Sequence, residues 1–410
     1  MTTPEPIRVS PEEISTDPIG DDRFSRFRLI HWWNQERIAS ARVLVVGAGA
    51  LGNEILKNLA LLGFRKILVV DLDRIEISNL SRSVLYRESD IGRDKAEAAA
   101  AAVRAIYPSA NVVGLRTNVM HQLGLGVFDW ADIVLGGLDN REARLFLNRS
   151  AWKMGKTWID GAIEGINGVV RVFESGKPAC YECTLGEVDW AILERRMSCN
   201  LLTRADLEQG KVATTPTTSA VIAGIQVQEA LKLLHGLPSL SGKGYVFEGL
   251  NHTSYLTEYT PDPDCQSHYV FDRILRLPRR SDETTLGDLM AIAVNELATG
   301  DVTLEFSRDV IWKLVHPVSG KEDERFAPLG SIAYEEGHDP EDGVLRDVVT
   351  CHGFTRDELI DSPQWSNRLL SELGLPLYDV FVARSANAEL ALLMAGDAQG
   401  VLGSLAEVRS

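Results

Sequence analysis

Cysteine is scarce in this chain, with only five among 410 residues. A count that is both low and odd argues against a disulfide framework and favours a metal site or a reactive thiol. Positive charge is also in short supply: 42 Lys and Arg stand against 58 Asp and Glu, a formal net charge of −16. Such an acidic surface argues against general nucleic-acid binding, because affinity for nucleic acid depends on cations that neutralise phosphates.

Long apolar runs are missing as well. No stretch approaches the roughly 20 apolar residues of a membrane-spanning helix, and the first residues (MTTPEPIRVSPEEISTDP) lack the apolar centre of a secretory signal. We therefore expect a cytoplasmic protein with no membrane partner. What is present is an ordinary globular composition, 45% apolar and 24% charged, over a length that allows two or three domains.

Hydrophobic patterning divides the chain. Residues 1–20 are rich in Pro, Glu, Ser and Thr and are expected to form a flexible tail. Short apolar runs then alternate with helical patterns, which predicts an α/β fold with a mostly parallel, Rossmann-like sheet. The predicted strands are 43–46, 67–70, 112–115, 133–135 and 157–159, and the predicted helices are 50–62, 94–106 and 140–154. Residues 164–174 alternate more like antiparallel strands.

A polar stretch over 184–215 shows few periodic signals and is long for a loop, as functional loops often are. A helix over 217–235 and a hairpin over 244–259 follow it. The character changes after Pro261, where mixed strand and helix patterns begin. We predict a first domain over 21–268, which contains the 184–215 loop, and a smaller C-terminal α+β domain over 269–410.

The sequence GAGALG at 47–52 follows a buried-type strand and opens a helix. Glycines at Gly47, Gly49 and Gly52 would let backbone N–H groups approach phosphates at a helix N-terminus. Asp71 ends the next strand, where the hydroxyls of a ribose would lie. By itself this pattern indicates a dinucleotide-binding enzyme, and the alternative is a tight turn without a ligand.

The residues after the second strand are more specific. DLDRIEISNLSR at 71–82 and GRDKA at 92–96 gather polar and cationic side chains that a dehydrogenase does not need. An enzyme that attacks the α-phosphate of ATP does need them, because negative charge spreads over the phosphates during the reaction. GLDN at 137–140 closes another strand, and its carboxylate could hold Mg²⁺. The predicted nucleotide-contacting residues of these motifs are Asp73, Asn79, Arg82, Lys95, Asp139 and Asn140.

These four motifs together resemble the ThiF/MoeB/ubiquitin-activating (E1) superfamily over about residues 22–268. The resemblance implies ATP-dependent adenylation of the C-terminal glycine of a ubiquitin-like or sulfur-carrier protein. It implies that Asp71 binds the ATP ribose and that Asp139 holds the magnesium. It assigns the contacts with the phosphates to Asn79, Arg82 and Lys95.

RFSR at 23–26 is similar to the R-Y-x-R-Q segment of the same family. The second arginine of that segment reaches into the ATP site of the partner subunit, so Arg26 implies a homodimer. This chain departs from the family at Phe27, where the family commonly has Gln.

Three cysteines and one histidine form two pairs whose spacing is typical of zinc ligands. CYEC at 180–183 is a zinc half-site, and CQSH at 265–268 is its best completion. Thiolate and imidazole are both good zinc ligands, so Cys180, Cys183, Cys265 and His268 are an acceptable tetrahedral set. The family often has a fourth cysteine where this chain has His268.

Cys199 remains, inside the long polar stretch. Arg195 and Arg196 could favour its thiolate, and the alternative is a spare cysteine. In the family the catalytic cysteine lies in such a crossover loop, which implies a thioester on Cys199. Some relatives place this cysteine in the stretch that corresponds to 211–216, which contains none here. Cys351 stands beside His352, but neighbouring side chains rarely converge, and we interpret Cys351 as a core residue.

The resemblance extends to partners. A C-terminal domain in two-domain E1 enzymes receives an E2 conjugating enzyme, and residues 269–410 are a candidate for that role by analogy. An E1-like core with such an extension resembles the bacterial enzymes of Bil-type antiviral conjugation operons. The alternatives are a sulfur-carrier adenylyltransferase without an E2 and a non-catalytic scaffold that binds a ubiquitin-like protein. A nicotinamide dehydrogenase would leave Asn79, Arg82, Lys95 and the cysteine pair unexplained.

Overall fold

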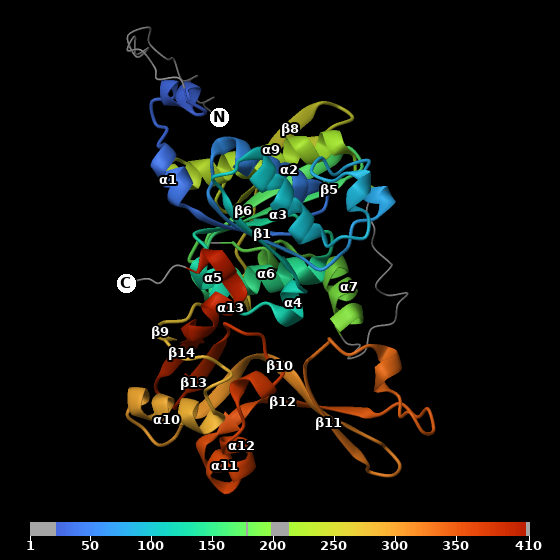
Figure 1. Cartoon of the computed structure of the whole chain (residues 1–410), viewed down its shortest axis with the longest axis vertical. Helices are drawn as coiled ribbons and strands as arrows, with labels where there is room; N and C mark the ends of the chain where they lie inside the picture. Colours follow the sequence, from blue (N-terminus) through green and yellow to red (C-terminus); the bar gives the residue numbers. More distant parts are fainter. Residues whose placement is uncertain (1–21, 178, 198–212, 407–410) are drawn as a thin grey trace.

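The computed structural model describes residues 22–177, 179–197 and 213–406. Two sheets dominate it, and they lie one beyond the other along the long axis of the molecule (Figure 1). The larger sheet is built from residues up to Glu258, and the smaller one begins at Ile274.

The larger sheet has eight strands in the order β3-β2-β1-β4-β5-β6-β7-β8. The first five strands of that order run parallel, and the last three join by antiparallel pairing. This is the predicted Rossmann-like arrangement. The strands are β1 (Arg42–Val46), β2 (Lys66–Asp71), β3 (Asn111–Arg116), β4 (Ile133–Gly136), β5 (Trp158–Glu164), β6 (Asn167–Phe173), β7 (Lys243–Glu248) and β8 (Thr253–Glu258).

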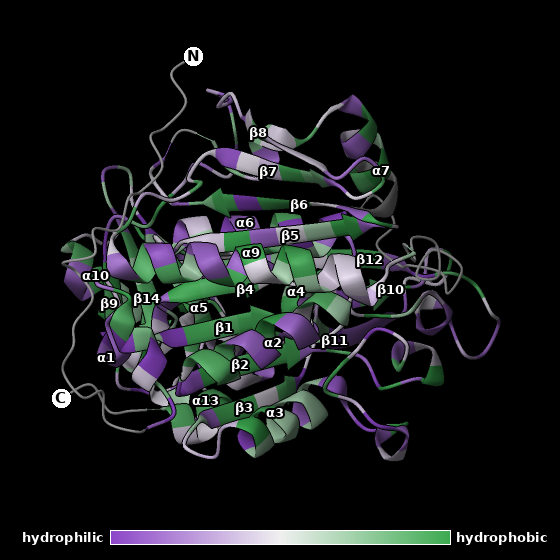
Figure 2. Ribbon diagram, turned by 90° about the horizontal axis from the view of Figure 1, so that it is seen from above, coloured by the Kyte–Doolittle hydropathy of each residue, from purple (hydrophilic) through white to green (hydrophobic). Residues whose placement is uncertain are grey.

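Helices cover both faces of this sheet, because its central strands are apolar on both sides and every residue of β4 is buried. Figure 2 shows α9, α2 and α3 in front of the sheet, with α4, α5 and α6 behind it. The front helices are α2 (Ala50–Leu62), α3 (Lys95–Ile106) and α9 (Pro216–His235), and α1 (Gln35–Ser40) precedes β1. The rear helices are α4 (Val119–Gln122), α5 (Gly126–Trp130) and α6 (Arg141–Lys153).

The polar stretch predicted to lack periodic structure contains a helix, α7 (Glu187–Met197), so that prediction was wrong for its first third. Tertiary contacts explain the helix better than its weak apolar pattern does. Leu193 is fully buried in the core behind the sheet. Asp189 accepts hydrogen bonds from the N–H of Gly186, at 3.1 Å, and from Nε of Arg141 on α6, at 2.7 Å.

The smaller sheet orders its strands β11-β10-β13-β14-β9, with β12 also paired to β10. All of its pairings are antiparallel except that of β14 with β9, and helices pack on it, as expected for an α+β unit. The elements are β9 (Ile274–Leu277), α10 (Leu286–Leu297), β10 (Thr303–Val315), β11 (Glu322–Pro328), β12 (Asp347–Thr355), α11 (Arg356–Asp361), α12 (Pro363–Ser366), β13 (Val380–Arg384), β14 (Glu389–Met394) and α13 (Ala398–Leu402).

The two sheets share an apolar core on the face of the larger sheet that carries α5 and α6. Polar contacts reinforce it: Arg276 donates two hydrogen bonds to the carboxylate of Asp129, at 2.8 and 2.6 Å. The last described residues return to the larger sheet, where Ser404 hydrogen-bonds the side chain of Asn111 at the start of β3. None of the helices in the described ranges combines the length and apolar character needed to span a membrane.

Candidate active site

The glycine-rich turn between β1 and α2 is shaped by its own packing at two of its three glycines. A Cβ on Gly47 would lie 2.4 Å from the carbonyl oxygen of Gly137, and one on Gly52 would lie 1.9 Å from that of Gly47. Gly47 also has a φ of +95°, a conformation that favours glycine. Gly49 is different, because a Cβ there would meet no atom within 4 Å. A tight turn therefore explains Gly47 and Gly52, and the open space at Gly49 leaves room for a phosphate at the start of α2.

Asp71 supports this turn from the end of β2. Its Oδ2 accepts the N–H of Ala48 at 2.7 Å, and its Oδ1 accepts the N–H of Asp73 at 2.8 Å. Burial raises the pKa of Asp71, and the nearby Lys95 ammonium works in the opposite direction. Asp71 thus holds the glycine loop in place. It also lies at the position where the sequence predicts a contact with the ribose.

Lys95 is the first residue of α3 and is only 9% exposed. Its Nζ donates a hydrogen bond to Oδ2 of Asp73 at 2.7 Å. The sequence predicts both residues as nucleotide contacts, and the structure adds that they form an ion pair. The Asp73 side chain is half-exposed, so the pair faces solvent beside the glycine loop.

Asn79 and Arg82 lie in the segment that joins β2 to α3. Oδ1 of Asn79 accepts the N–H of Glu76 at 2.9 Å and closes a short 3₁₀ turn, Ile77–Asn79. Nη1 of Arg82 donates to the carbonyl oxygen of Ser78 at 2.7 Å. Both side chains therefore make local hydrogen bonds, at the edge of the sheet where the parallel strands end.

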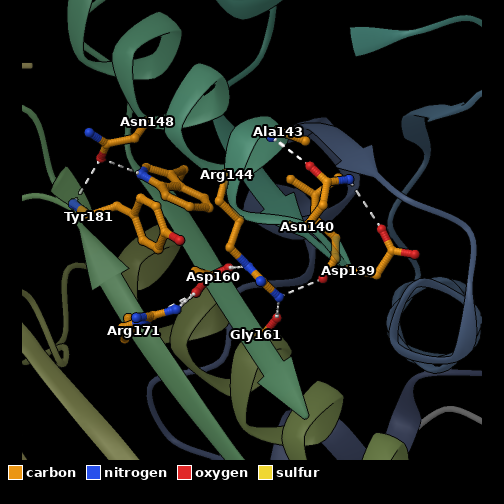
Figure 3. Close-up of polar contacts among 12 residues, drawn as sticks. Asp139, Asn140, Ala143, Arg144, Asn148, Asp160, Gly161, Arg171 and Tyr181 are labelled. Atoms are coloured by element: carbon orange, nitrogen blue, oxygen red, sulfur yellow. Dashed lines mark hydrogen bonds and ion pairs between the residues drawn. The ribbon is translucent and has the colours of Figure 1, made fainter. Parts of the chain in front are cut away.

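Asp139 and Asn140 follow β4 and reach the same edge. The N–H of Gly137 donates to the carbonyl oxygen of Val46 at 2.8 Å, which brings this loop against the glycine loop. Asn140 caps α6 through its Oδ1, which accepts the N–H of Ala143 at 2.8 Å (Figure 3). Its Nδ2 lies 3.2 Å from Oδ1 of Asp139. Asp139 is exposed, and its carboxylate is a suitable oxygen ligand for Mg²⁺.

Arg26 is exposed on a short 3₁₀ turn and is held far from this edge. Arg23 donates to the carbonyl oxygen of the last residue of α3 at 2.9 Å. The ring of Phe24 packs where a Cβ on Gly63, just past the end of α2, would lie. Since α2 begins at the glycine loop and its 13 residues rise about 20 Å, Arg26 is not positioned to act on the site of its own chain.

Sequence reasoning missed a cluster of three charged residues that is joined to the Asp139 loop through the carbonyl oxygen of Leu138. Arg144 donates to Oδ1 of Asp160 at 3.0 Å and to the carbonyl oxygen of Leu138 at 2.5 Å, and Arg171 donates to Oδ2 of Asp160 at 2.9 Å (Figure 3). Asp160 is fully buried. Burial opposes its charge, but Arg171 and Arg144 outweigh burial and lower the pKa of Asp160. The only sequence signal was an acidic residue directly after the strand predicted over 157–159.

The predicted zinc ligands come together. The ligand atoms of Cys180, Cys183, Cys265 and His268 all lie within 4.8 Å of one another. Sγ of Cys180 lies 3.5 Å from that of Cys265, and Sγ of Cys183 lies 3.4 Å from Nε2 of His268. Three thiols and an imidazole in this space match the donor set of a tetrahedral zinc site. Burial raises the pKa of Cys180, so zinc binding would have to displace its proton.

Helix α6 connects this thiol cluster with the glycine-loop edge. Oδ1 of the buried Asn148 accepts the N–H of Tyr181 at 3.0 Å and Nε1 of Trp158 at 3.1 Å (Figure 3). Arg149 donates to both carboxylate oxygens of Glu182, at 3.0 and 2.8 Å. One helix therefore carries the Asp139 loop at its start and holds the Cys180–Cys183 segment near its end.

Two cysteines are not among the predicted zinc ligands, Cys199 and Cys351. Cys199 lies outside the described residues. Cys351 packs against the apolar core of the smaller sheet, in agreement with its interpretation as a core residue. His352 is exposed, and its Nδ1 lies 2.5 Å from Oδ1 of Asp309. Cys351 and His352 therefore have separate surroundings.

Comparisons with known proteins show which family this chain belongs to. The model of the ThiF family matches residues 22–267. The SUMO-activating enzyme subunit uba-2 of Caenorhabditis elegans is 40% identical over 149 residues, which are 36% of this chain and 26% of that protein. The NEDD8-activating enzyme E1 catalytic subunit of the same organism is 36% identical over 199 residues, 42% of this chain and 46% of that protein. The chain thus spans less than half the length of these relatives.

Among solved structures, the crystal structure of Escherichia coli MccB with ATP superposes with a TM-score of 0.51 at 21% identity. The superposition covers 61% of this chain and 75% of MccB. At this level of identity the likeness is one of fold.

Proposed function

We propose that this chain, which belongs to the ThiF family, is an ATP-dependent enzyme that adenylates the C-terminal glycine of a ubiquitin-like protein. One observation carries the proposal. The glycine loop is open at Gly49, and the Lys95–Asp73 pair and the exposed Asp139 lie on the segments that border it. A cradle lined by a cation and a carboxylate suits a triphosphate with its metal.

In this reaction a carboxylate oxygen of the terminal glycine attacks the α-phosphorus of ATP. A carbon–oxygen–phosphorus linkage forms, the bond between the α-phosphorus and the bridging oxygen breaks, and pyrophosphate leaves with that electron pair. Lys95, Arg82 and Asn79 would face the charge that builds on the phosphates. Asp71 would accept a hydrogen bond from the ribose. Magnesium held by Asp139 would neutralise phosphate charge.

Arg26 enters this proposal only through a second copy of the chain. Its anchorage at the far ends of α2 and α3 keeps it from its own glycine loop. We assign it to the phosphates bound by the partner subunit of a homodimer. Each site would then be complete only when two chains associate.

The later steps concern Cys199 and an E2-like protein. The proposed thiolate of Cys199 attacks the acyl carbon of the adenylate, a thioester forms and AMP leaves with the bridging oxygen. Support comes from the crossover position of Cys199 in the sequence and from relatives whose names are those of SUMO- and NEDD8-activating enzymes. The smaller sheet is the proposed surface for the E2-like protein.

Product analysis tests adenylation. The chain is incubated with Mg-ATP and candidate ubiquitin-like proteins that end in glycine, and the nucleotides are separated by chromatography. Pyrophosphate and the protein adenylate, formed only with a ubiquitin-like protein, are the expected products, and AMP follows when the acyl group is transferred or hydrolysed. Formation of ADP and phosphate instead, or no turnover with any candidate, would contradict the proposal.

A covalent adduct tests the thioester step. Intact mass spectrometry should detect an adduct that a thiol reagent removes, that is lost in Cys199→Ala and that persists in the matched variant Cys351→Ala. Adenylation should survive in both variants. If adenylation occurs but no adduct forms on the wild-type chain, a sulfur-carrier adenylyltransferase without an E2 is the better account.

A further inference from the structure

Two buried polar side chains on the inner side of the glycine loop have no role in the proposed function as stated so far. Asn53 lies one turn into α2 and is fully buried. Tyr86 lies between the Arg82 segment and α3 and is 4% exposed. Neither residue belongs to the motifs that indicate nucleotide binding, and both touch the backbone of the loop that does.

Asn53 bonds to the loop with both ends of its amide. Its Nδ2 donates to the carbonyl oxygen of Ala48 at 2.7 Å and to that of Gly49 at 3.0 Å. Its Oδ1 accepts the N–H of Leu85 at 2.9 Å. The glycine loop and the segment that carries Arg82 are therefore joined through one side chain.

Tyr86 adds a second connection. Its hydroxyl lies 2.6 Å from the carbonyl oxygen of Ala48 and 3.2 Å from that of Lys95, the residue paired with Asp73. Burial raises the pKa of Tyr86, so the phenol keeps its proton and remains a donor at neutral pH. The nearer contact makes Ala48 the main acceptor.

These bonds determine which way the loop's N–H groups point. In a trans peptide the N–H is directed opposite to the preceding carbonyl. The carbonyl of Ala48 is held inward by Asn53 and Tyr86, so the N–H of Gly49 is turned outward, to the side where Gly49 has open space. The carbonyl of Gly49, held by Asn53, likewise turns the N–H of Ala50 outward.

We infer that Asn53 and Tyr86 are positioning residues for ATP: they hold the Gly49 and Ala50 amides toward the phosphates and fix the Arg82 and Lys95 segments to the same loop. The inference rests on the proposed function. It concerns affinity for the nucleotide and leaves recognition of the ubiquitin-like protein unaffected.

The test compares Tyr86→Phe with Tyr107→Phe. Tyr107 is similarly buried, and its hydroxyl bonds Nε of Arg65 at 3.2 Å, so the control also loses one buried hydroxyl contact. We measure the Kd of a non-hydrolysable Mg-ATP analogue by calorimetry, the KM values of both substrates and the Tm. Tyr86→Phe should raise the Kd and the KM for ATP about tenfold and leave the KM for the ubiquitin-like protein within twofold. Tyr107→Phe should change neither KM by more than about twofold.

Asn53→Ser provides a second variant should Tyr86→Phe fold poorly, and the same pattern of KM changes is expected of it. If the wild type binds the ATP analogue tightly and Tyr86→Phe binds it equally well, the inference is overturned and the proposed function stands. An equal loss of affinity for the ATP analogue in Tyr107→Phe would also overturn the inference, because the effect would then come from general destabilisation of the fold. No binding by the wild type would overturn the proposed function, and this inference with it.

Discussion

At the scale of single residues, the site depends on charges that the fold pairs within the chain. Lys95 lies against Asp73, and the fully buried Asp160 accepts hydrogen bonds from Arg144 and Arg171. The two arrangements differ in exposure. The Lys95–Asp73 pair faces solvent, so a phosphate could replace Asp73 as the partner of Lys95. The Asp160 cluster is enclosed, and its Arg144 holds the carbonyl of Leu138, the residue before Asp139.

Asp160→Asn should destabilise the chain by about 3 kcal/mol, because two buried guanidinium groups would lose their countercharge. The pKa of Asp160 is lowered in the folded state. Its stabilising contribution is therefore complete above the unfolded pKa of about 3.9 and is lost as the pH falls through the folded-state pKa. Urea unfolding at several pH values should show the gap between wild type and Asp160→Asn narrowing below about pH 4. A gap that is constant with pH would contradict this role.

At the scale of elements, helix α6 is the piece that joins the two predicted sites. Its cap residue Asn140 neighbours Asp139, and Asn148 and Arg149 hold the segment that contains Cys180 and Cys183. The four predicted zinc ligands come from two segments on either side of β7 and β8. A metal there would cross-link those segments.

Cys180→Ser should lower bound zinc from one ion per chain toward none. Loss of the cross-link should cost about 3 kcal/mol, a fall in Tm of roughly 6–12 °C for a unit of this size. Metal analysis and thermal unfolding check both values. Cys351→Ser is the matched control and should keep its zinc. Zinc-free wild-type protein, or a Tm that does not respond to Cys180→Ser, would contradict the assignment.

Elements marked by strong local patterns could be predicted from the sequence, and those stabilised by distant contacts could not. The buried strand before Gly47 and the apolar face of α2 repeat with a clear period, so their places were predicted within a few residues. Helix α7 lacks such a pattern and depends on Asp189 meeting Arg141.

The same limit applies within the site. The motifs predict Lys95 and Asp139 as site residues, because their residue types match phosphate and magnesium chemistry. The bonds of Asn53 to Leu85 and of Arg144 to Asp160 join residues 32 and 16 positions apart. In each pair the two residues lie on different segments, where no local period connects them, so only the fold reveals these bonds.

At the scale of the whole molecule, each site is expected to need two chains. Arg26 is exposed at the end of the molecule's larger sheet opposite its own glycine loop. The smaller sheet is held to the face with α5 and α6 by Arg276 and Asp129. The face with α2, α3 and the Arg26 turn lies on the other side (Figure 1).

Mixing two inactive variants tests the shared site. Arg26→Ala and Lys95→Ala should each lose most adenylation alone, because each lacks one cation at the phosphates. A mixed dimer contains one site with both substitutions and one site with neither. Random pairing in an equal mixture makes half of the dimers mixed, and each mixed dimer has one intact site of two. The mixture should therefore recover roughly a quarter of wild-type activity. Failure to recover any activity, with mixed dimers confirmed by mass spectrometry, would contradict the contribution of Arg26 across subunits.

Exchange of labelled pyrophosphate into ATP tests the central claim most directly, because it reports reversible cleavage between the α- and β-phosphates. The wild-type chain should catalyse exchange only with Mg²⁺ and a ubiquitin-like protein. Lys95→Ala should reduce the rate at least 100-fold, an effect of about 3 kcal/mol on the barrier. Arg93→Ala, which removes a nearby cation that pairs with Asp90 at 2.5 Å, should remain within about threefold of wild type. Wild-type exchange that Lys95→Ala leaves intact, or a wild-type chain that binds ATP and never exchanges pyrophosphate, would contradict the account.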